Sequence, residues 1–339
     1  MHFHNLWGPD AQIDSGGTLV VQPLPGIGDA LWHLPHIRAI ARTAPDRRVT
    51  LLTKERSLAE RLFAAEPMVH RVLWLHRNPG LHDGPVGFFR LAALLRRHRF
   101  TSAWVLHASA RYAQAAVAAS IAERHGYGLG RQRWFLNRPP YLSPGSSGGH
   151  PIEKANQLMA AKGLPLLDQD QNLPISSEAA RVIADRYGRC LGPWIALGIG
   201  SSETYKQWGG LNFAALAATL SAPERRTLFL LGGPAERDLG QEIAEQVRVL
   251  GGEVETAVDL PIDQSAALLS RCRLYVGNDT GVLNLAAAVG TEAIGLFGGS
   301  PPLTYSRNIH VVLPPSATAG MAGITPEQVA AEAAKFGLD

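Results

Sequence analysis

Short apolar runs alternate with longer amphipathic segments through the first half of the chain. Each run is followed by a segment in which apolar residues recur with the spacing of a helix. The runs are "TLVVQP" (18–23), "VTLLT" (49–53), "RVLWL" (71–75) and "SAWVLHA" (102–108). This alternation predicts repeated βαβ units and a mostly parallel sheet.

The pattern is interrupted in the middle of the chain and then restarts. Residues 139–150, "PPYLSPGSSGGH", predict a loop, and a helical segment over 151–165 precedes the polar link "LLDQDQNLPISS". Four further apolar runs follow: "WIALGIG" (194–200), "RTLFLLGG" (226–233), "LYVGND" (274–279) and "EAIGLFGG" (292–299). The sequence therefore predicts an α/β protein of two βαβ halves, joined near residues 165–178, with a cleft between them.

Composition and length fit this interpretation. A chain of 339 residues is long enough for two domains, and 46% hydrophobic with 18% charged residues is typical of a soluble globular protein. No apolar run approaches the roughly 20 residues that cross a bilayer. The first 17 residues lack the apolar core and basic leader of a secretory signal, so we expect a cytoplasmic location.

Cysteine usage and charge add little that is specific. Cys190 and Cys272 have no paired spacing, which favours two core thiols in a reducing compartment. Arginines cluster in "LLRRHRF" and "GRQRWFLNR" although the net charge is only +3. Such clusters favour an anionic partner or a membrane surface, and solvated helix ends explain each of them equally well.

Ligands of open parallel sheets bind at the carboxyl ends of the strands, so the loops there are the candidate sites. In "ALGIGSSETYKQW" (196–208), a strand end is followed by Ser201, Ser202 and Lys206. Backbone N–H groups, hydroxyls and an ammonium together suit a phosphate. The spacing of a P-loop is absent, and an ordinary surface lysine is the alternative.

Two other strand ends in the second half carry acids. Glu236 in "FLLGGPAERD" suits a ribose hydroxyl pair, or else a charge at a helix N-terminus. In "LYVGNDTGVLNLAAAVG", Thr280 and Gly281 begin a helix and offer N–H groups and a hydroxyl to a phosphate, with Asp279 as a candidate N-cap. Together these loops suit a nucleoside diphosphate sugar.

An acid also follows the first predicted strand, in "LPGIGDALWHLP" (24–35). A negative charge there disfavours a phosphate cradle, so Asp29 suits a general base that takes a proton from an attacking hydroxyl. His33 lies one helical turn further on and either tunes that base or is a satisfied polar residue.

These motifs resemble those of glycosyltransferase family 9, the bacterial ADP-heptose:lipopolysaccharide heptosyltransferases. The resemblance rests on "GIGDALWHLP", "GSSETYKQW", "GGPAERD" and "YVGNDTGVLNLAAAVGTEAIGLFG", and in weaker form covers residues 18–305. It implies a GT-B architecture of two Rossmann-like domains facing a cleft. Acceptor binding then falls on residues 1–170 and nucleotide-sugar binding on 171–324, while the last helix (325–337) packs back on the first domain.

The resemblance also implies an inverting, metal-independent transfer from a nucleotide sugar, ADP-heptose, to a lipopolysaccharide inner-core sugar, with no further cofactor. The general base falls on Asp29. The implied substrate-binding residues are Gly28, Ser201, Ser202 and Lys206 near the diphosphate, Glu236 at the ribose, Leu260 at the adenine, and Asp279, Thr280 and Gly281 in the donor-phosphate loop. The "DQD" at 168–170 has the letters of a metal site but lies in the predicted link, which favours a solvated turn.

The acceptor side is less well defined. Arg111 and Arg133, with Arg131 and Arg138, are candidates for phosphates or carboxylates of an anionic glycan or glycolipid at the inner face of the inner membrane. No nucleic-acid partner is expected. The sequence departs from the family in "QPLPGI", where a basic residue is common, in Asn284, where His is common, and in "FGGSPP".

These departures leave the sugar and the acceptor open. Transfer to a protein hydroxyl or to another glycan is the nearest alternative. A nucleotide-sugar epimerase of similar fold and a binding protein without catalysis are alternatives from other classes.

Overall fold

The computed structural model describes residues 16–337 apart from 191, 222–225 and 303–304. The expectation about a leader concerns the first 17 residues, of which 1–15 lie outside the described part. The chain forms two compact units. The first unit runs to Pro25 and adds His33–Ser57 and Pro67–Asp170, and the second unit contains Gly26–Trp32, Leu58–Glu66 and the chain from Gln171 onward.

The first unit is built on a parallel sheet in the order β3-β2-β1-β4-β5. Its strands are β1 (Thr18–Val21), β2 (Val49–Thr53), β3 (Val69–Trp74), β4 (Ser102–Val105) and β5 (Glu123–Gly126). Its helices are α2 (Leu34–Ala41), α4 (Gly84–Arg97), α5 (Ala110–Ala118) and α6 (Pro151–Ala161). Thr18 pairs with both Val49 and Ser102, so β1 lies at the centre of the sheet.

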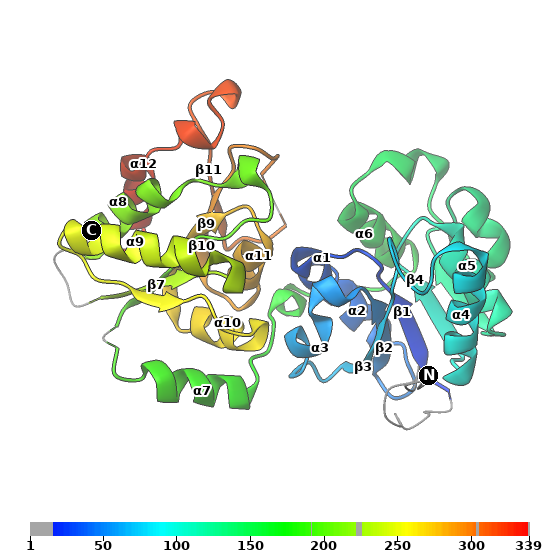
Figure 1. The fold of residues 1–339 in the computed structure, drawn as a ribbon. Coiled ribbons are helices and arrows are strands. Elements are labelled where there is room, and N and C mark those ends of the chain that lie inside the picture. The colour runs from blue at the N-terminus through cyan, green and yellow to red at the C-terminus, as the bar shows by residue number, and fades with distance from the viewer. Residues whose placement is uncertain (1–15, 191, 222–225, 303–304, 338–339) are drawn as a thin grey trace, which may run out of the picture. The chain divides into compact units, whose positions relative to one another are not determined.

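Alternate residues of the strands face opposite layers of helices. Leu19 and Val21 of β1 pack with Leu91 of α4 and Ala115 of α5 in one core cluster. The helices α4 and α5 lie together on one side of the sheet in Figure 1, and α2 lies on the other. Both faces are therefore buried, which explains the continuous apolar runs of the central strands.

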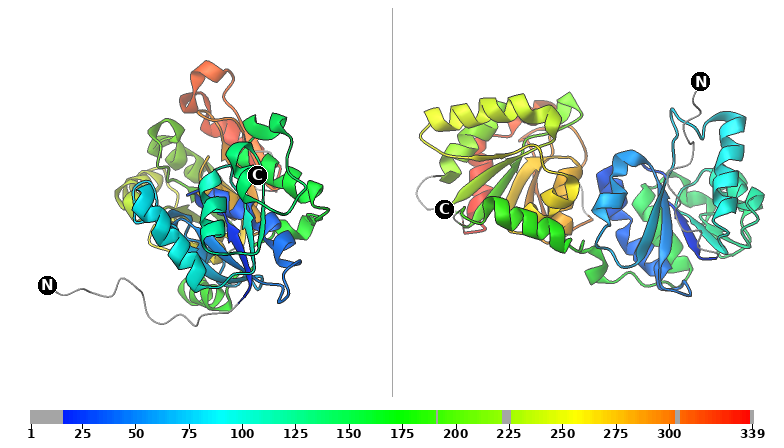
Figure 2. Two further views of the ribbon diagram at one scale, coloured as in Figure 1. Left: turned by 90° about the vertical axis from the view of Figure 1, so that its right-hand side faces the viewer. Right: turned by 60° about the horizontal axis from the view of Figure 1, so that its bottom comes forward.

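The second unit has six parallel strands in the order β11-β10-β9-β6-β7-β8. They are β6 (Trp194–Gly198), β7 (Thr227–Leu231), β8 (Glu255–Ala257), β9 (Cys272–Asn278), β10 (Glu292–Leu296) and β11 (Ile309–Val312). The helices are α1 (Ile27–Trp32), α3 (Ala59–Leu62), α7 (Ser177–Tyr187), α8 (Gly210–Ser221), α9 (Arg237–Val249), α10 (Ile262–Leu269), α11 (Gly281–Ala288) and α12 (Pro326–Ala334). Figure 2 (right) shows this sheet between α9 in yellow and α7 in green.

The C-terminal helix α12 packs within the second unit. Its Val329 and Ala333 are buried in the core cluster of that unit, together with Phe213 of α8 and Leu296 of β10. The apolar stripe of α12 is covered by α8 and β10. Packing of this helix on the first unit stays a prediction from the sequence.

Both sheets have the strand order of a Rossmann fold. In each sheet, the second and third strands lie on one side of the first strand and the later strands lie on its other side, so the strand order reverses at one point. That switch point lies between β1 and β4 in the first unit, and between β6 and β9 in the second. The predicted alternation of strands and helices is confirmed, and the predicted link contains the break between Asp170 and Gln171. The edge strands β5, β8 and β11 were not predicted.

Two smaller expectations concern thiols and membrane spans. Cys272 is buried, as a core thiol should be, whereas Cys190 is only half-buried. Across the described residues, every helix is too short or too polar to cross a bilayer.

Candidate functional site

The loops after β6 and β9 meet at the switch point of the second unit. Asn278, the last residue of β9, is fully buried, and its side chain ties the two loops together. Its Oδ1 accepts the Trp208 N–H at 3.1 Å, and its Nδ2 donates to the carbonyls of Ile199 at 3.3 Å and Gly200 at 3.2 Å. Asn278 was not predicted as a site residue, although a polar residue at the end of a buried strand was an available signal.

Lys206 lies at the centre of this loop pair. It ends the short 3₁₀ turn Thr204–Lys206, and its Nζ lies 2.8 Å from Glu203 Oε2 and 3.1 Å from Asp279 Oδ2. Its side chain is only 17% exposed, and that of Asp279 13%. Burial alone would lower the pKa of Lys206, but the bonds to Glu203 and Asp279 outweigh it and raise the pKa above its ordinary value. This lysine is not the loose surface residue that the sequence left as an alternative.

Asp279 is held from a third strand as well. Ser300, which follows β10, donates its hydroxyl to Asp279 Oδ2 at 2.5 Å. Asp279 is not the N-cap of α11, because Thr280 occupies that position with an extended backbone and without a capping bond from its side chain. The first N–H groups of α11, from Gly281 onward, have no partner within the helix and carry the positive end of its dipole.

The two predicted serines differ in their roles. The Ser201 hydroxyl donates to the Glu203 carbonyl at 3.0 Å and accepts the Glu203 N–H at 3.2 Å, so it shapes the turn that ends at Lys206. The Ser201 carbonyl accepts a bond from Gln207 Nε2 at 3.1 Å. Ser202 is exposed at the tip of the same loop.

Glu236 lies at the end of the next strand, β7. Its Oε2 accepts the Gly233 N–H at 2.7 Å, which closes the turn into α9. It sits against two glycines: a Cβ on Gly200 would lie 3.1 Å from its Cδ, and one on Gly232 would lie 3.0 Å from its Cβ. Lack of a side chain at Gly200 and Gly232 therefore lets the acid lie close to the loops of β6 and β7.

Leu260 follows β8, the edge strand beyond β7. It is 8% exposed, and its carbonyl accepts a bond from the Ser265 hydroxyl at 3.4 Å. The carboxyl edge of the sheet thus carries Asp279 at β9, Lys206 at β6, Glu236 at β7 and Leu260 at β8, in that order. Neighbouring strands are roughly 4.8 Å apart, so this row is about 14 Å long.

Asp29 lies on α1, which belongs to the second unit and packs on α11. Its Oδ2 accepts the Gly26 N–H at 2.9 Å. The packing depends on two glycines, since a Cβ on Gly281 would lie 2.9 Å from the Ile27 Cβ and one on Gly28 would lie 3.0 Å from Asn284 Nδ2. The turn that carries Asp29 is therefore seated against the start of the helix that follows Asp279.

Asn284 fixes this arrangement with its side-chain amide. Trp32 Nε1 donates to Asn284 Oδ1 at 2.8 Å, and Asn284 Nδ2 donates to the Thr280 carbonyl at 2.9 Å. The residue that departs from the family pattern is thus a structural link between α1 and the loop that contains Asp279 and Thr280. Trp208 is buried and its indole N–H donates to the Ile324 carbonyl at 2.8 Å. His33 is buried, with its ring centroid 5.4 Å from that of His36.

The first unit places one predicted arginine at the carboxyl edge of its own sheet. Arg111, at the start of α5, donates to the carbonyls of His82 at 2.7 Å and Gly84 at 2.8 Å. Its pKa is lowered by burial and by Arg77. Arg111 therefore supports the loop after β3 in this structure.

The other arginines differ. Arg133 lies in the 3₁₀ turn Gly130–Phe135, with its guanidinium 5.3 Å from the Tyr141 ring centroid, and Arg131 is exposed beside it. Arg138 pairs with Glu123 at the opposite edge of the sheet, where the strands begin. Arg131, Arg133 and Arg138 are close together in the sequence, but their side chains have different surroundings in the structure.

Two residues at the carboxyl edge of the first unit were not predicted. Arg77 follows β3, bonds Asp83 Oδ1 at 3.1 Å and lies 3.4 Å from the Tyr112 hydroxyl. His107 follows β4, accepts the Ser109 N–H at 3.0 Å, and has a pKa lowered by burial and by Arg77. Their positions directly after strands were the available signal.

Among the described residues, no group of three or more His, Cys, Asp or Glu side chains is arranged so that it could hold a metal ion. The "DQD" segment forms the 3₁₀ turn Asp168–Gln171 in the link between the units.

The family model for glycosyltransferase family 9 (heptosyltransferase) matches residues 88–321. Lipopolysaccharide heptosyltransferase 3 of Escherichia coli is 23% identical over 291 residues, which cover 80% of this chain and 81% of that protein. The structure of E. coli ADP-heptose lipopolysaccharide heptosyltransferase II has a TM-score of 0.72 at 22% identity, covering 94% of this chain and 98% of that one.

A second E. coli structure, heptosyltransferase WaaC with ADP-2-deoxy-2-fluoro heptose, has a TM-score of 0.73 at 18% identity, covering 94% of this chain and 99% of that one. These likenesses confirm the GT-B fold class predicted from the sequence. The family model covers more than half of the chain and includes the loops of Lys206, Glu236 and Asp279. This chain therefore belongs to glycosyltransferase family 9, the heptosyltransferases, and is a glycosyltransferase.

Proposed function

We propose that this enzyme moves heptose from ADP-heptose to a hydroxyl of a lipopolysaccharide inner-core sugar, with inversion at the anomeric carbon and without a metal ion. One observation carries the proposal: the order of residues along the carboxyl edge of the second sheet. A nucleoside diphosphate sugar presents sugar, diphosphate, ribose and base in line. From β9 to β8, the edge of the sheet presents Lys206 and the first N–H groups of α11, then the acid Glu236, then the apolar Leu260.

Lys206 neutralises the diphosphate in this proposal. The donor displaces Glu203, the more exposed of the two acids on the ammonium, while Asp279 keeps the lysine in place. The first N–H groups of α11 and the Ser202 hydroxyl bind the remaining phosphate oxygens. Glu236 accepts from the ribose hydroxyls, and Leu260 borders the adenine. The structure of WaaC with a fluorinated ADP-heptose supports this choice of donor.

Asp29 acts as the general base. Its carboxylate removes the proton of the acceptor hydroxyl as that oxygen attacks the anomeric carbon. The new carbon–oxygen bond forms on the face opposite the leaving group, and the bond to the phosphate oxygen breaks with its electron pair on ADP. Back-side attack inverts the configuration. The negative charge that develops on the leaving phosphate is stabilised by Lys206 and by α11.

Acceptor binding falls to the first unit in this proposal, with residues 1–170 holding the acceptor and 171–324 the donor. Arg77 and His107 lie at the carboxyl edge of the first sheet, where ligands of such sheets bind. Arg133 offers a further guanidinium for an anionic core sugar. Contact with the inner membrane surface and a cytoplasmic location stay predictions from the sequence.

Release of ADP tests the proposal. The enzyme is incubated with ADP-heptose and a lipopolysaccharide fragment that ends in an inner-core 3-deoxy-octulosonate sugar, with matched reactions that lack the acceptor or contain UDP- or GDP-sugars. We expect ADP release only when both substrates are present, and a product linkage inverted relative to the donor. Turnover of the donor without any acceptor would indicate an epimerase or hydrolase. Transfer to a protein or to another glycan, but not to this fragment, would overturn the proposed acceptor.

A further inference from the structure

The first unit contains a cavity of about 670 Å³ that is separate from the carboxyl edge of its sheet. Its wall includes the first residues of three strands, namely Thr18 of β1, Ser102 of β4 and Glu123 of β5. The cavity therefore opens at the amino ends of the strands. Arg77 and His107, which lie at the carboxyl edge, are not among the residues that line it.

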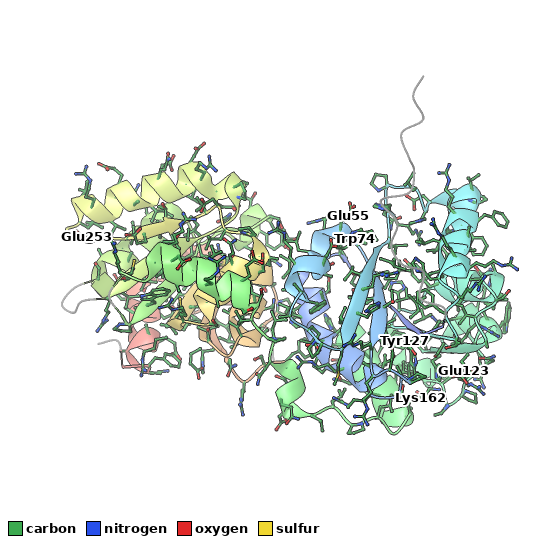
Figure 3. The ribbon with its side chains drawn as sticks, turned by 90° about the horizontal axis from the view of Figure 1, so that it is seen from below. Glu55, Trp74, Glu123, Tyr127, Lys162 and Glu253 are labelled. Carbon is green, nitrogen blue, oxygen red and sulfur yellow. The ribbon has the colours of Figure 1, made fainter. Side chains whose placement is uncertain are left out.

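One cation in this cavity has no acidic partner. Lys162, directly after α6, donates from Nζ to the Arg138 carbonyl, and the same Nζ lies 5.9 Å from the centroid of the Trp104 ring. Arg138 itself is paired with Glu123. Within the part of the chain that the structure describes, Lys162 forms no ion pair. The cavity therefore carries an uncompensated positive charge. Figure 3 shows Lys162 and Glu123 near one another on the first unit.

Two rings form the floor beside this ammonium. Trp104 and His125 are stacked, with centroids 3.9 Å apart and planes 4° from parallel. His125 Nδ1 is buried and has no hydrogen-bond partner among the described residues. Burial and the nearby Lys162 lower the pKa of His125 to about 4, so this ring is neutral at physiological pH and adds no charge to the site.

Hydroxyl groups complete the wall. The cavity is bordered by Thr18, Thr43, Thr101 and Ser102. The Thr43 and Thr101 hydroxyls already donate to backbone carbonyls and keep their acceptor positions. A volume of 670 Å³ lies within the range of small-molecule sites, and far exceeds what one inorganic ion fills.

We propose that this cavity binds a sugar-sized anion, a molecule with one phosphate or carboxylate group held by Lys162 and hydroxyls that face the serine and threonine side chains. The site is distinct from the proposed donor row, which lies in the second unit. Desolvation by burial, and Arg138, lower the pKa of Lys162 to about 8. An anion favours the charged ammonium, so its affinity falls as pH rises through about 8.

Calorimetric titration of the full chain tests the site with four probes: glucose 6-phosphate, glucuronate, glucose and inorganic phosphate. The variants are Lys162→Met, the conservative Lys162→Arg, and Arg96→Met, which removes an equal charge from the exposed face of α4. We expect at least one of the two charged sugars to bind, with Lys162→Met weakening it by roughly 10-fold or more. Lys162→Arg and Arg96→Met should retain binding.

The pattern among probes identifies the ligand class. Preference for glucose 6-phosphate indicates a phosphate ligand, and preference for glucuronate a carboxylate ligand. Equal binding of glucose, binding of inorganic phosphate alone, or binding that survives Lys162→Met at full strength would each overturn the proposal. Saturation with ADP in the same cell should leave the titration unchanged, so this result does not depend on whether the donor site is correctly assigned.

Discussion

Lys206 Nζ and Asp279 Oδ2 lie 3.1 Å apart at the point where strands β6 and β9 end side by side. The pair joins two loops that are far apart in the sequence, and Glu203 binds the same ammonium at 2.8 Å. A cation held between two carboxylates is oriented before a ligand arrives. The cost is that the diphosphate must compete with Glu203 for the ammonium.

Removal of the lysine should weaken the donor. Lys206→Ala deletes a charge-assisted contact worth about 1.5–3 kcal/mol, so we expect ADP to bind roughly 10- to 150-fold more weakly. Lys206→Arg should recover part of the loss. Titration calorimetry with ADP measures the effect, and Lys335→Ala, which removes an exposed lysine of the same unit, is the matched control. Unchanged ADP affinity in Lys206→Ala would remove this residue from the donor site.

The pH dependence of ADP binding follows from the raised pKa of Lys206. Its pKa lies above the ordinary 10.5, despite burial, because of the bonds to Glu203 and Asp279. The ammonium therefore stays charged across the neutral and mildly alkaline range. We expect the contribution of Lys206 to ADP affinity to stay constant between pH 7.5 and about 9.5. A decline in this range that disappears in Lys206→Arg would contradict the assigned pKa direction.

Close packing of α1 on α11 should tolerate no side chain at Gly281. A Cβ there would lie 2.9 Å from the Ile27 Cβ, an atom that cannot move without the backbone of α1. We expect Gly281→Ala to lower the free energy of unfolding by about 1–3 kcal/mol. Gly145→Ala is the matched control, because a Cβ at Gly145 meets no atom within 4 Å. Urea unfolding of the three proteins measures the difference, and equal midpoints would show that α1 is not seated on α11.

Lys162 should make stability depend on pH in a defined direction. Burial, together with Arg138, lowers its pKa from 10.5 to about 8 in the folded chain. Between these values the unfolded chain binds a proton that the folded chain has lost, so this group makes stability rise with pH. Unfolding in urea at pH 8, 9 and 10 should show this rise in the wild type relative to Lys162→Met. Parallel curves for the two proteins would contradict the lowered pKa.

The sequence predicted the central strands well because they are buried on both faces and read as apolar runs. It missed β5, β8 and β11, which lie at the edges of the sheets and whose residues, such as Glu123 and Glu255, are largely polar or exposed. Edge strands are paired on one side only, so their sequences need no continuous apolar run. Their assignment depends on a neighbour that only the three-dimensional structure supplies.

The candidate donor site followed from the rule that ligands lie at carboxyl ends of strands, and it included Lys206, Glu236 and Asp279. The sequence did not predict that Asp279 binds Lys206 rather than capping α11, because that choice depends on strand order. Asn278 and Asn284 were not predicted as structural links for the same reason. The sequence motifs identified the loops. The hydrogen-bond partners of the loop side chains depend on residues that are far apart in the sequence, and these contacts only the structure shows.

The reaction rate of Asp29→Asn shows whether Asp29 is the general base. The asparagine keeps the shape of the side chain and an oxygen for the Gly26 N–H, but it cannot take a proton. With ADP-heptose and the inner-core acceptor, we expect acceptor-dependent ADP release to fall by roughly 10²- to 10⁴-fold, while the affinity for ADP stays within about 2-fold of wild type. A variant that retains the wild-type rate would show that the proton goes elsewhere, and would contradict the account.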